Sequence, residues 1–381
     1  MTFTKQKSGK KMYKTKILDD LDEMRKVDRS NMITFCAEMP KHYEKAKQLA
    51  KAISIDYPKP ETIIVAGMGG SAIGGELVKD WSRDKIVMPI EVCREYSLPK
   101  YANKNTLAII VSYSGETEET LSVFLDAIKR GCMTFCISSG GVLQDFAEKL
   151  RVPYLLVPSG MAPRASLPYL FLPLLLMLEK ADLISNVNSE ISDAIRNLKQ
   201  VVDANSPEKL LGKNFAKRLA SSLNGTVPVV YGFEIYCSVA HRLKTQFNEN
   251  SKVPAKWECF SELDHNEIVG WEAANELAKH LSAIFIRDDS ESEAMRTRID
   301  FTQEMMRKQS LKIYEIKSIG KSRLAKMSSV ICIGDFTSVY LAITRGIDPT
   351  PVKSIGSLKK RLKQNGTKEK IIDELQKIAK K

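Results

Sequence analysis

The sequence predicts an α/β protein made of two doubly wound parallel sheets with flanking helices. Short apolar runs rich in β-branched residues alternate with helical patterns, and this alternation occurs twice along the chain. A helix-rich stretch at residues 169–222 separates the two series. The chain has 381 residues, of which 43% are hydrophobic, enough for two or three domains with proper cores.

The first series follows a helical segment at residues 17–55. Its expected strands lie at residues 62–66, 86–92, 107–112, 133–138 and 153–157. Its expected helices lie at residues 72–82, 117–130 and 142–150. The apolar run from Tyr169 to Leu178 is interrupted by Pro173 and is shorter than the roughly 18 residues of a membrane span, so it indicates a buried helix.

The second series has expected strands at residues 227–231, 282–287, 311–316 and 328–333. Its expected helices lie near residues 234–247, 272–281, 291–308 and 337–346. Residues 108–118 align with 283–293, and residues 65–67 align with 230–232. The two halves therefore look like a diverged internal repeat, in which the second copy has lost the glycines and one hydroxyl. Chance similarity is the alternative explanation.

The expected divisions are a basic N-terminal tail and helix at 1–40, a first sheet domain at 41–185, a second at 200–362 and a basic C-terminal tail at 363–381. The formal net charge is +12, and the two ends carry it, since residues 1–16 hold +6 and residues 353–381 hold +7. The near-neutral body argues against a nucleic-acid-binding domain. We expect the basic ends to be solvated, with at most weak contacts to polyanions.

The seven cysteines are scattered and form no CxxC pair, so the sequence does not indicate a zinc site. We expect them to be reduced, buried thiols of a cytoplasmic protein. The lysine-rich N-terminus has no apolar signal core, which also favours the cytoplasm.

A glycine-rich loop follows the expected strand at residues 62–66. It holds five glycines, at positions 67, 69, 70, 74 and 75, and a helical pattern follows. Glycine lets the backbone approach a ligand, and a helix N-terminus attracts anions, so this loop predicts a phosphate site. The string Gly67-x-Gly69-x-x-Ala72 also fits a dinucleotide fingerprint, and Glu91 or Glu95 could hold the ribose.

A second loop decides between these ligands. Ser112, Ser114 and Thr117 surround Gly115 at the end of the strand expected at 107–112, where ligands bind in open α/β sheets. Capping of the next helix would need one hydroxyl, not three. Together the two loops indicate a pocket for a single phosphoryl group. The chain contains no Gly-Lys-Ser/Thr string of the kind that binds ATP or GTP.

These loops resemble the phosphate site of the sugar isomerase (SIS) domain family. The resemblance extends to the bifunctional phosphoglucose/phosphomannose isomerases of archaeal type and runs from about Leu18 to Leu362. Further motifs carry it: Pro158-x-Gly160-x-x-Pro163-Arg164-Ala165, Gln246-x-Asn248-Glu249-Asn250-x-Lys252, Glu262-Leu263-x-His265-Asn266-Glu267-Ile268-x-Gly270, Asp348-Pro349-x-Pro351-Val352 and Leu358-Lys359. The resemblance implies two SIS-type subdomains and an aldose–ketose isomerase acting on hexose 6-phosphates.

The resemblance also assigns roles to residues. The expected phosphate-binding residues are Gly69, Gly70, Ser71, Ser112, Ser114 and Thr117. Glu249 is the expected base, which requires that burial raise its pKa, with Asn248 and Asn250 to orient it. An exposed helix-end glutamate is the alternative reading of Glu249.

His265 is the expected ring-opening residue. In this family it reaches into the neighbouring subunit, which implies a homodimer. Arg164 is expected to stabilise an enediolate oxygen, with a helix-start ion pair as the alternative. Lys359 completes the expected catalytic set, although it lies beside Lys360 and Arg361, where a solvated face is the alternative. The family uses no metal and no redox cofactor, and we expect no membrane and no specific nucleic acid as partner.

One residue departs from the family pattern. Position 116 is Glu, where an uncharged residue such as Asn is usual, and an inward-pointing carboxylate would weaken phosphate binding.

Three other functions were weighed. A non-catalytic sugar-phosphate regulator would need a DNA-binding domain, for which residues 1–56 offer too few helices. A glucosamine-6-phosphate synthase would need an N-terminal cysteine, whereas residue 2 is Thr. A nicotinamide-dependent oxidoreductase rests only on Gly67-x-Gly69-x-x-Ala72.

Overall fold

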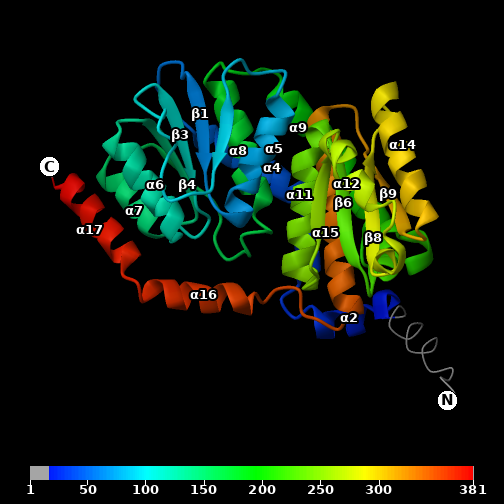
Figure 1. Ribbon diagram of the computed structural model, residues 1–381. Coiled ribbons are helices and arrows are strands. Elements are labelled where there is room, and N and C mark those ends of the chain that lie inside the picture. The colour runs from blue at the N-terminus through cyan, green and yellow to red at the C-terminus, as the bar shows by residue number, and fades with distance from the viewer. Residues whose placement is uncertain (1–16, 381) are drawn as a thin grey trace. The chain divides into compact units, whose positions relative to one another are not determined.

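The computed structural model describes residues 17–380, so the expected tail at residues 1–16 lies outside the described residues. The described chain forms two compact units (Figure 1). Of the described residues, 41–191 and 352–380 form what we call the first unit. Residues 17–40 and 192–351 form what we call the second unit.

The first unit is built on a five-stranded parallel sheet. Its strands are β1 (Thr62–Ala66), β2 (Ile90–Cys93), β3 (Thr106–Val111), β4 (Met133–Ser138) and β5 (Tyr154–Leu156). Their order is β2-β1-β3-β4-β5, and the register pairs Val65 with Val92 and Ile109. Every residue of β3 and β4 is buried, as expected where helices cover both faces of a parallel sheet.

The first unit also contains helices. They are α4 (Met39–Leu49), α5 (Ile73–Ser82), α6 (Glu118–Lys129), α7 (Gly141–Lys149), α8 (Leu167–Lys180), α16 (Lys353–Lys363) and α17 (Thr367–Ala379), while α9 (Val187–Asn205) begins in this unit. Helix α8 contains the apolar run with Pro173 and is buried from Leu167 to Leu178, so the expectation of a buried helix is confirmed.

The second unit is built on a four-stranded parallel sheet. Its strands are β6 (Val227–Phe233), β7 (Lys256–Phe260), β8 (Leu281–Arg287) and β9 (Lys312–Lys317), in the order β7-β6-β8-β9. Its helices are α2 (Leu21–Val27), α3 (Met32–Ala37), α10 (Phe215–Leu223), α11 (Cys237–Gln246), α12 (Glu267–Gly270), α13 (Asn275–Ala278), α14 (Glu293–Lys308) and α15 (Arg323–Thr344).

The strand order supports an internal repeat. The order β2-β1-β3-β4 in the first sheet corresponds to β7-β6-β8-β9 in the second. The aligned segments 108–118 and 283–293 begin in the equivalent strands β3 and β8, and the segments at 65–67 and 230–232 lie on β1 and β6. The predicted fold of two parallel sheets with flanking helices is therefore confirmed.

One predicted element of the second unit was wrong, and one strand was missed. Residues 328–333, expected as a strand, lie inside α15, because a buried helix and a buried strand give the same short apolar run. Ser322 caps α15 by accepting a hydrogen bond from the Ala325 N–H. Strand β7 was missed, because this edge strand alternates exposed and half-buried residues and carries no apolar run.

Helix α15 is the core helix of the second unit. Among residues 17–380 it alone is long and apolar enough to cross a membrane, and all of its apolar window is buried. It packs against α10 and α11, as a core helix does.

The C-terminal segment differs from a solvated tail. Helix α17 packs on α6 and α7, where Ile371 and Leu375 join the hydrophobic core of the first unit (Figure 1). The high basic charge of this segment led to the expectation of a solvated tail, whereas residues 367–379 form an amphipathic helix.

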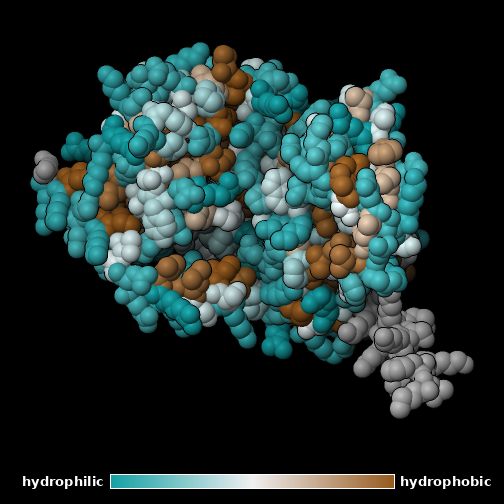
Figure 2. Space-filling view, viewed as in Figure 1, coloured by the Kyte–Doolittle hydropathy of each residue, from teal (hydrophilic) through white to brown (hydrophobic). Residues whose placement is uncertain are grey.

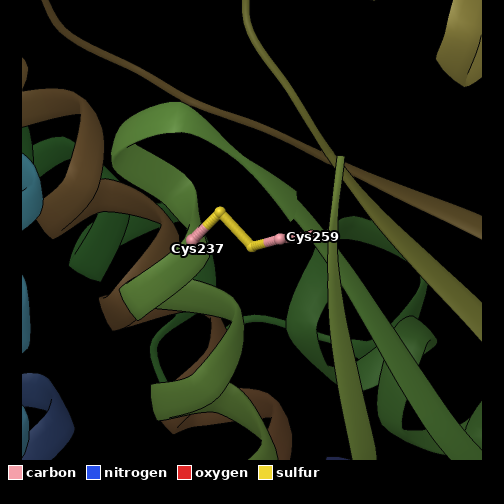
Figure 3. Close-up of a disulfide and its surroundings, with 2 residues drawn as sticks. All are labelled: Cys237 and Cys259. Atoms are coloured by element: carbon pink, nitrogen blue, oxygen red, sulfur yellow. A yellow bond between two sulfur atoms is a disulfide. The ribbon is translucent and has the colours of Figure 1, made fainter. Parts of the chain in front are cut away.

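The expectation of reduced thiols was wrong for two cysteines. Cys237 on α11 and Cys259 on β7 form a disulfide (Figure 3). Their Cα atoms are 5.6 Å apart, within the range that a disulfide spans. The sequence could not predict this pair because the missed strand β7 carries Cys259. The other five cysteines are free and buried, as expected.

Candidate functional site

The glycine-rich loop lies at the carboxyl end of β1. Gly69–Ser71 form a 3₁₀ turn, and Gly69 has φ +52°, a conformation that favours glycine. A Cβ on Gly67 would lie 2.8 Å from the Val111 carbonyl oxygen, so β1 and β3 approach closely here. The turn leads directly into α5, whose N-terminus faces the carboxyl edge of the sheet, where anions bind favourably.

The hydroxyl loop at residues 112–117 meets the glycine loop. Ser71 Oγ accepts a hydrogen bond of 3.1 Å from the Tyr113 N–H. Ser112 Oγ donates to Thr117 Oγ1 at 3.2 Å. The expected phosphate residues thus lie in two loops that a hydrogen bond joins. We call Gly69, Gly70, Ser71, Ser112, Ser114 and Thr117 the candidate phosphate cup.

A third loop, at residues 139–143, supports the hydroxyl loop from behind. Ser139 donates through its N–H and its hydroxyl to the Tyr113 carbonyl, and the Leu143 N–H donates to the Gly115 carbonyl. A Cβ on Gly115 would lie 1.8 Å from the Gly140 carbonyl oxygen. These bonds occupy the carbonyls of Tyr113 and Gly115 and fix the backbone of the hydroxyl loop. Sequence reasoning missed this support, although Gly140 and Gly141 after a strand were a visible signal.

Arg164 is placed beside the glycine loop. A Cβ on Gly70 would lie 2.9 Å from the Pro163 carbonyl oxygen and 3.2 Å from the Arg164 nitrogen. The Arg164 side chain is buried, with an exposed fraction of 2%. Tyr113 fixes the approach of this segment, because its hydroxyl donates to the Pro158 carbonyl and accepts from the Met161 N–H. The backbone of a buried arginine therefore lies next to Gly70 of the candidate phosphate cup.

Glu116 has a partner on each side. Its Oε1 accepts a hydrogen bond of 3.1 Å from the Val142 N–H in the first turn of α7. Its Oε2 pairs with the Lys368 ammonium of α17. The Glu116 carboxylate, which was expected to weaken phosphate binding if it pointed inward, is thus bound by α7 and α17.

The equivalent position in the second sheet holds a carboxylate in place of a cup. Asp288 follows β8 and accepts hydrogen bonds from Lys326 Nζ, Ser290 and the Tyr236 hydroxyl. Burial alone would raise the pKa of Asp288, but these donors outweigh it and hold the pKa well below its ordinary value. The second copy of the repeat therefore pairs this carboxylate with donors of its own unit.

Glu249 lies on the second unit, in a π-helical turn at Phe247–Ser251 that continues α11. Such turns are rare and occur often at functional sites. Lys252, in a left-handed conformation, ends the turn and donates to the carbonyls of Glu249 and Pro349, each at 2.7 Å. Glu249 is half-buried.

Neighbouring polar side chains fix this turn. The Asn248 amide donates to the Val253 carbonyl, and the Asn250 amide donates to Ser338 Oγ on α15. Both asparagines thus hold the backbone that carries Glu249. One turn earlier, Arg242 and Asp335 form a buried ion pair at 3.0 Å.

His265 ends a short 3₁₀ turn (Glu262–His265) after β7, and its side chain is exposed. Its neighbours are anchored, because Asp264 pairs with Arg298 at 2.8 Å and Glu267 accepts from the Tyr231 hydroxyl. The imidazole is thus presented at the surface of its own unit from a fixed backbone.

The disulfide connects the two elements that carry Glu249 and His265 (Figure 3). Helix α11 leads into the turn with Glu249, and β7 leads into the turn with His265. His241 and Trp257 stack between the same two elements, with ring centroids 4.8 Å apart. The covalent bond and the ring contact fix the helix against the strand.

Lys359 lies on α16, a helix without a buried residue in the described chain. Figure 2 shows apolar side chains exposed over α16, where Ile355 and Leu358 have exposed fractions of 42% and 57%. Within residues 17–380 the structure gives Lys359 no hydrogen bond and no ion pair, so it does not join Lys359 to the cup.

Comparisons with known proteins place the chain in a family. Residues 212–362 match the family model of the bacterial phospho-glucose isomerase C-terminal SIS domain. The chain is 40% identical over 327 residues to the bifunctional phosphoglucose/phosphomannose isomerase of Caldicellulosiruptor bescii, covering 85% of this chain and 96% of that protein. The enzyme of that name from Aquifex aeolicus is 33% identical over 82% of this chain and 94% of its own length.

The chain belongs to the bifunctional phosphoglucose/phosphomannose isomerase family. It is accordingly an isomerase, and the relatives support sugar-phosphate isomerase activity.

Solved structures agree with this family's fold. A hypothetical protein from Thermus thermophilus superposes with a TM-score of 0.72 at 12% identity, covering 93% of this chain and 96% of that one. A glucose-6-phosphate isomerase from Chlamydia trachomatis gives a TM-score of 0.64 at 13% identity, covering 85% of this chain and 73% of that one. At these identities the likeness concerns the fold alone.

Within the described residues, no group of three or more His, Cys, Asp or Glu side chains could hold a metal ion.

Proposed function

We propose that this protein interconverts glucose 6-phosphate and mannose 6-phosphate with fructose 6-phosphate in the cytoplasm, by proton transfer through an enediolate. The observation that carries the proposal is the candidate phosphate cup with the buried Arg164 beside it. Both catalytic activities are also named for the 40% identical relative from Caldicellulosiruptor bescii.

The cup binds the 6-phosphate in this proposal. Hydroxyl and backbone N–H donors recognise phosphoryl oxygens, and the N-termini of α5 and α6 add a favourable dipole. Because the phosphate lies at C6 of the sugar, the reacting C1 and C2 extend away from the cup. The groups that act on those carbons can therefore come from another part of the protein.

The proton transfers are assigned as follows. His265 moves a proton between O5 and O1 to open the ring. Glu249 then removes the proton from C2 of the aldose, the electrons of that bond form the C1–C2 double bond, and O1 becomes the enediolate oxygen. Arg164 stabilises the negative charge there. A proton passes from O2 to O1, and Glu249 returns its proton to C1, which gives the ketose.

This sequence of steps accounts for two aldose substrates. Glucose and mannose differ only in configuration at C2, and that configuration disappears in the enediolate. Protonation of C2 on one face gives glucose 6-phosphate, and protonation on the other gives mannose 6-phosphate. The ratio of products then depends on how the intermediate lies against Glu249.

We also propose a homodimer in which His265 acts in the neighbouring subunit's site, with Lys359 near the substrate. The exposed imidazole on an anchored turn supports this arrangement. Mixing E249Q and H265A subunits tests it. Random association of the two variants makes about half of the dimers mixed. If His265 acts across the interface, one of the two sites in each mixed dimer is intact, so activity recovers to about a quarter of the wild-type value. No recovery in mixtures shown to contain mixed dimers would overturn the shared site.

A coupled assay with each aldose phosphate tests the activity. We expect turnover of both glucose 6-phosphate and mannose 6-phosphate, unchanged by a metal chelator. Loss of activity with chelator would contradict the metal-free mechanism. Tight binding of the sugar phosphates without turnover would instead favour a non-catalytic sugar-phosphate regulator.

A further inference from the structure

Helix α17 attaches to the first unit beside the candidate phosphate cup. Its apolar face joins the core through Ile371 and Leu375, and it packs on α6, which begins directly after the hydroxyl loop. The family model matches residues 212–362, which include neither the cup nor α17 (Thr367–Ala379).

Two ion pairs join α17 to the rest of the unit. At its N-terminal end Lys368 pairs with Glu116 of the hydroxyl loop, and farther along Glu374 pairs with Lys129 at the end of α6. The first pair is the more shielded, since the Lys368 side chain has an exposed fraction of 24% and the Lys129 side chain one of 49%. Only the first pair touches the loop that contains Ser112, Ser114 and Thr117.

The Glu116 carboxylate belongs to the same turn as the cup hydroxyls. Ser114 Oγ accepts a hydrogen bond of 3.2 Å from the Glu116 N–H. A sugar phosphate carries close to two negative charges near neutral pH, so a free carboxylate in this turn would repel it. The Val142 N–H and the Lys368 ammonium together draw the carboxylate to the α7 side and compensate its charge.

We propose that Lys368 is a positioning residue for phosphate binding, which acts by holding Glu116 against the N-terminus of α7 and away from the cup. This inference rests on the proposed function of the cup. It assigns the C-terminal helix a role in substrate affinity.

The test compares variants of the full-length protein. K368M should weaken binding of inorganic phosphate and of fructose 6-phosphate by roughly three- to tenfold, because the carboxylate is no longer compensated. KM should rise by the same factor, while kcat stays within about twofold because Glu249 and His265 are untouched. K368R should restore affinity, and added salt should reduce the difference between K368M and wild type.

A matched control removes the other ion pair. K129M removes the ion pair between Lys129 and Glu374, which also joins α6 to α17. Because that pair does not touch the hydroxyl loop, the K129M protein should bind phosphate with wild-type affinity. The double variant K368M/E116N lacks the carboxylate as well as the lysine. Its affinity for phosphate should return to within about twofold of wild type, because the two residues act as a coupled pair whose effects are not additive.

The outcomes separate this inference from the proposed function. Isothermal titration with inorganic phosphate gives affinity without turnover, so a wild-type protein that binds phosphate but lacks isomerase activity would refute only the proposed function. Equal affinity in K368M and K129M, or failure of E116N to restore affinity to K368M, would overturn the role of Lys368. A wild-type protein that binds no phosphate would overturn both.

Discussion

Ser71 Oγ accepts a hydrogen bond from the Tyr113 N–H and so joins the glycine loop after β1 to the hydroxyl loop after β3. The serine is buried, with an exposed fraction of 6%, and the bond fixes one wall of the candidate phosphate cup against the other. Tyr113 extends the connection, because its side chain binds the segment that leads to Arg164. One residue thus ties the phosphate site to the candidate catalytic arginine.

Replacing Ser71 should affect both binding and stability. We expect S71A to lower the free energy of unfolding by about 1 kcal/mol, because the buried Tyr113 N–H loses its acceptor. KM for fructose 6-phosphate should rise, since a cup hydroxyl is lost. S139A is the control: it removes a bond to the Tyr113 carbonyl but no cup hydroxyl. Equal KM values for the two variants would argue against Ser71 as a phosphate ligand.

The contact between Gly70 and the Arg164 segment gives a second prediction. In G70A the new Cβ would press on the Pro163 carbonyl and the Arg164 backbone, so that segment must shift. We expect kcat to fall on the order of tenfold, as small displacements of catalytic groups do. G212A adds a Cβ that meets nothing within 4 Å, and its kinetics should match wild type. A fully active G70A protein would show that the arginine's placement there is unimportant.

Asp288 gives a prediction about acid stability. Its pKa in the folded protein lies below that of an unfolded aspartate, so it stabilises the fold above a pH of about 4, and this stabilisation is lost as the pH falls further. D288N should lower the free energy of unfolding at pH 7 by about 2 kcal/mol and flatten its decline on acidification. Denaturant titrations between pH 3 and 7 measure both effects. D289N, at an exposed neighbour, should retain the wild-type pH dependence.

The sequence predicted the first unit more fully than the second. The strands β1, β3 and β4 are buried throughout, apart from the first residue of β1, so their apolar runs stand out between glycines and polar loops. In the second unit, α15 is so apolar that part of it looked like a strand, and β7 is too exposed to look like one. Only the repeat, which requires a counterpart of β2, could have indicated β7.

The two loops of the candidate phosphate cup were predictable because each is a local motif. Their glycines and hydroxyls follow β1 and β3 and are visible in the sequence. The partners of Glu116 and Asp288 were not predictable, because Lys368 and Lys326 lie far along the chain and meet them only through tertiary packing. The Cys237–Cys259 bond was not predictable because the missed strand β7 carries Cys259.

The central claim is that Glu249 transfers the proton between C1 and C2, and E249Q tests it most directly. We predict that kcat with fructose 6-phosphate falls about a hundredfold or more, toward both aldose products, because the amide cannot act as a base. Titration calorimetry should give a dissociation constant for fructose 6-phosphate close to that of wild type, since the cup is intact. E304Q, which removes an exposed carboxylate on α14, should leave both quantities unchanged. An E249Q protein that keeps most of its kcat would contradict the account.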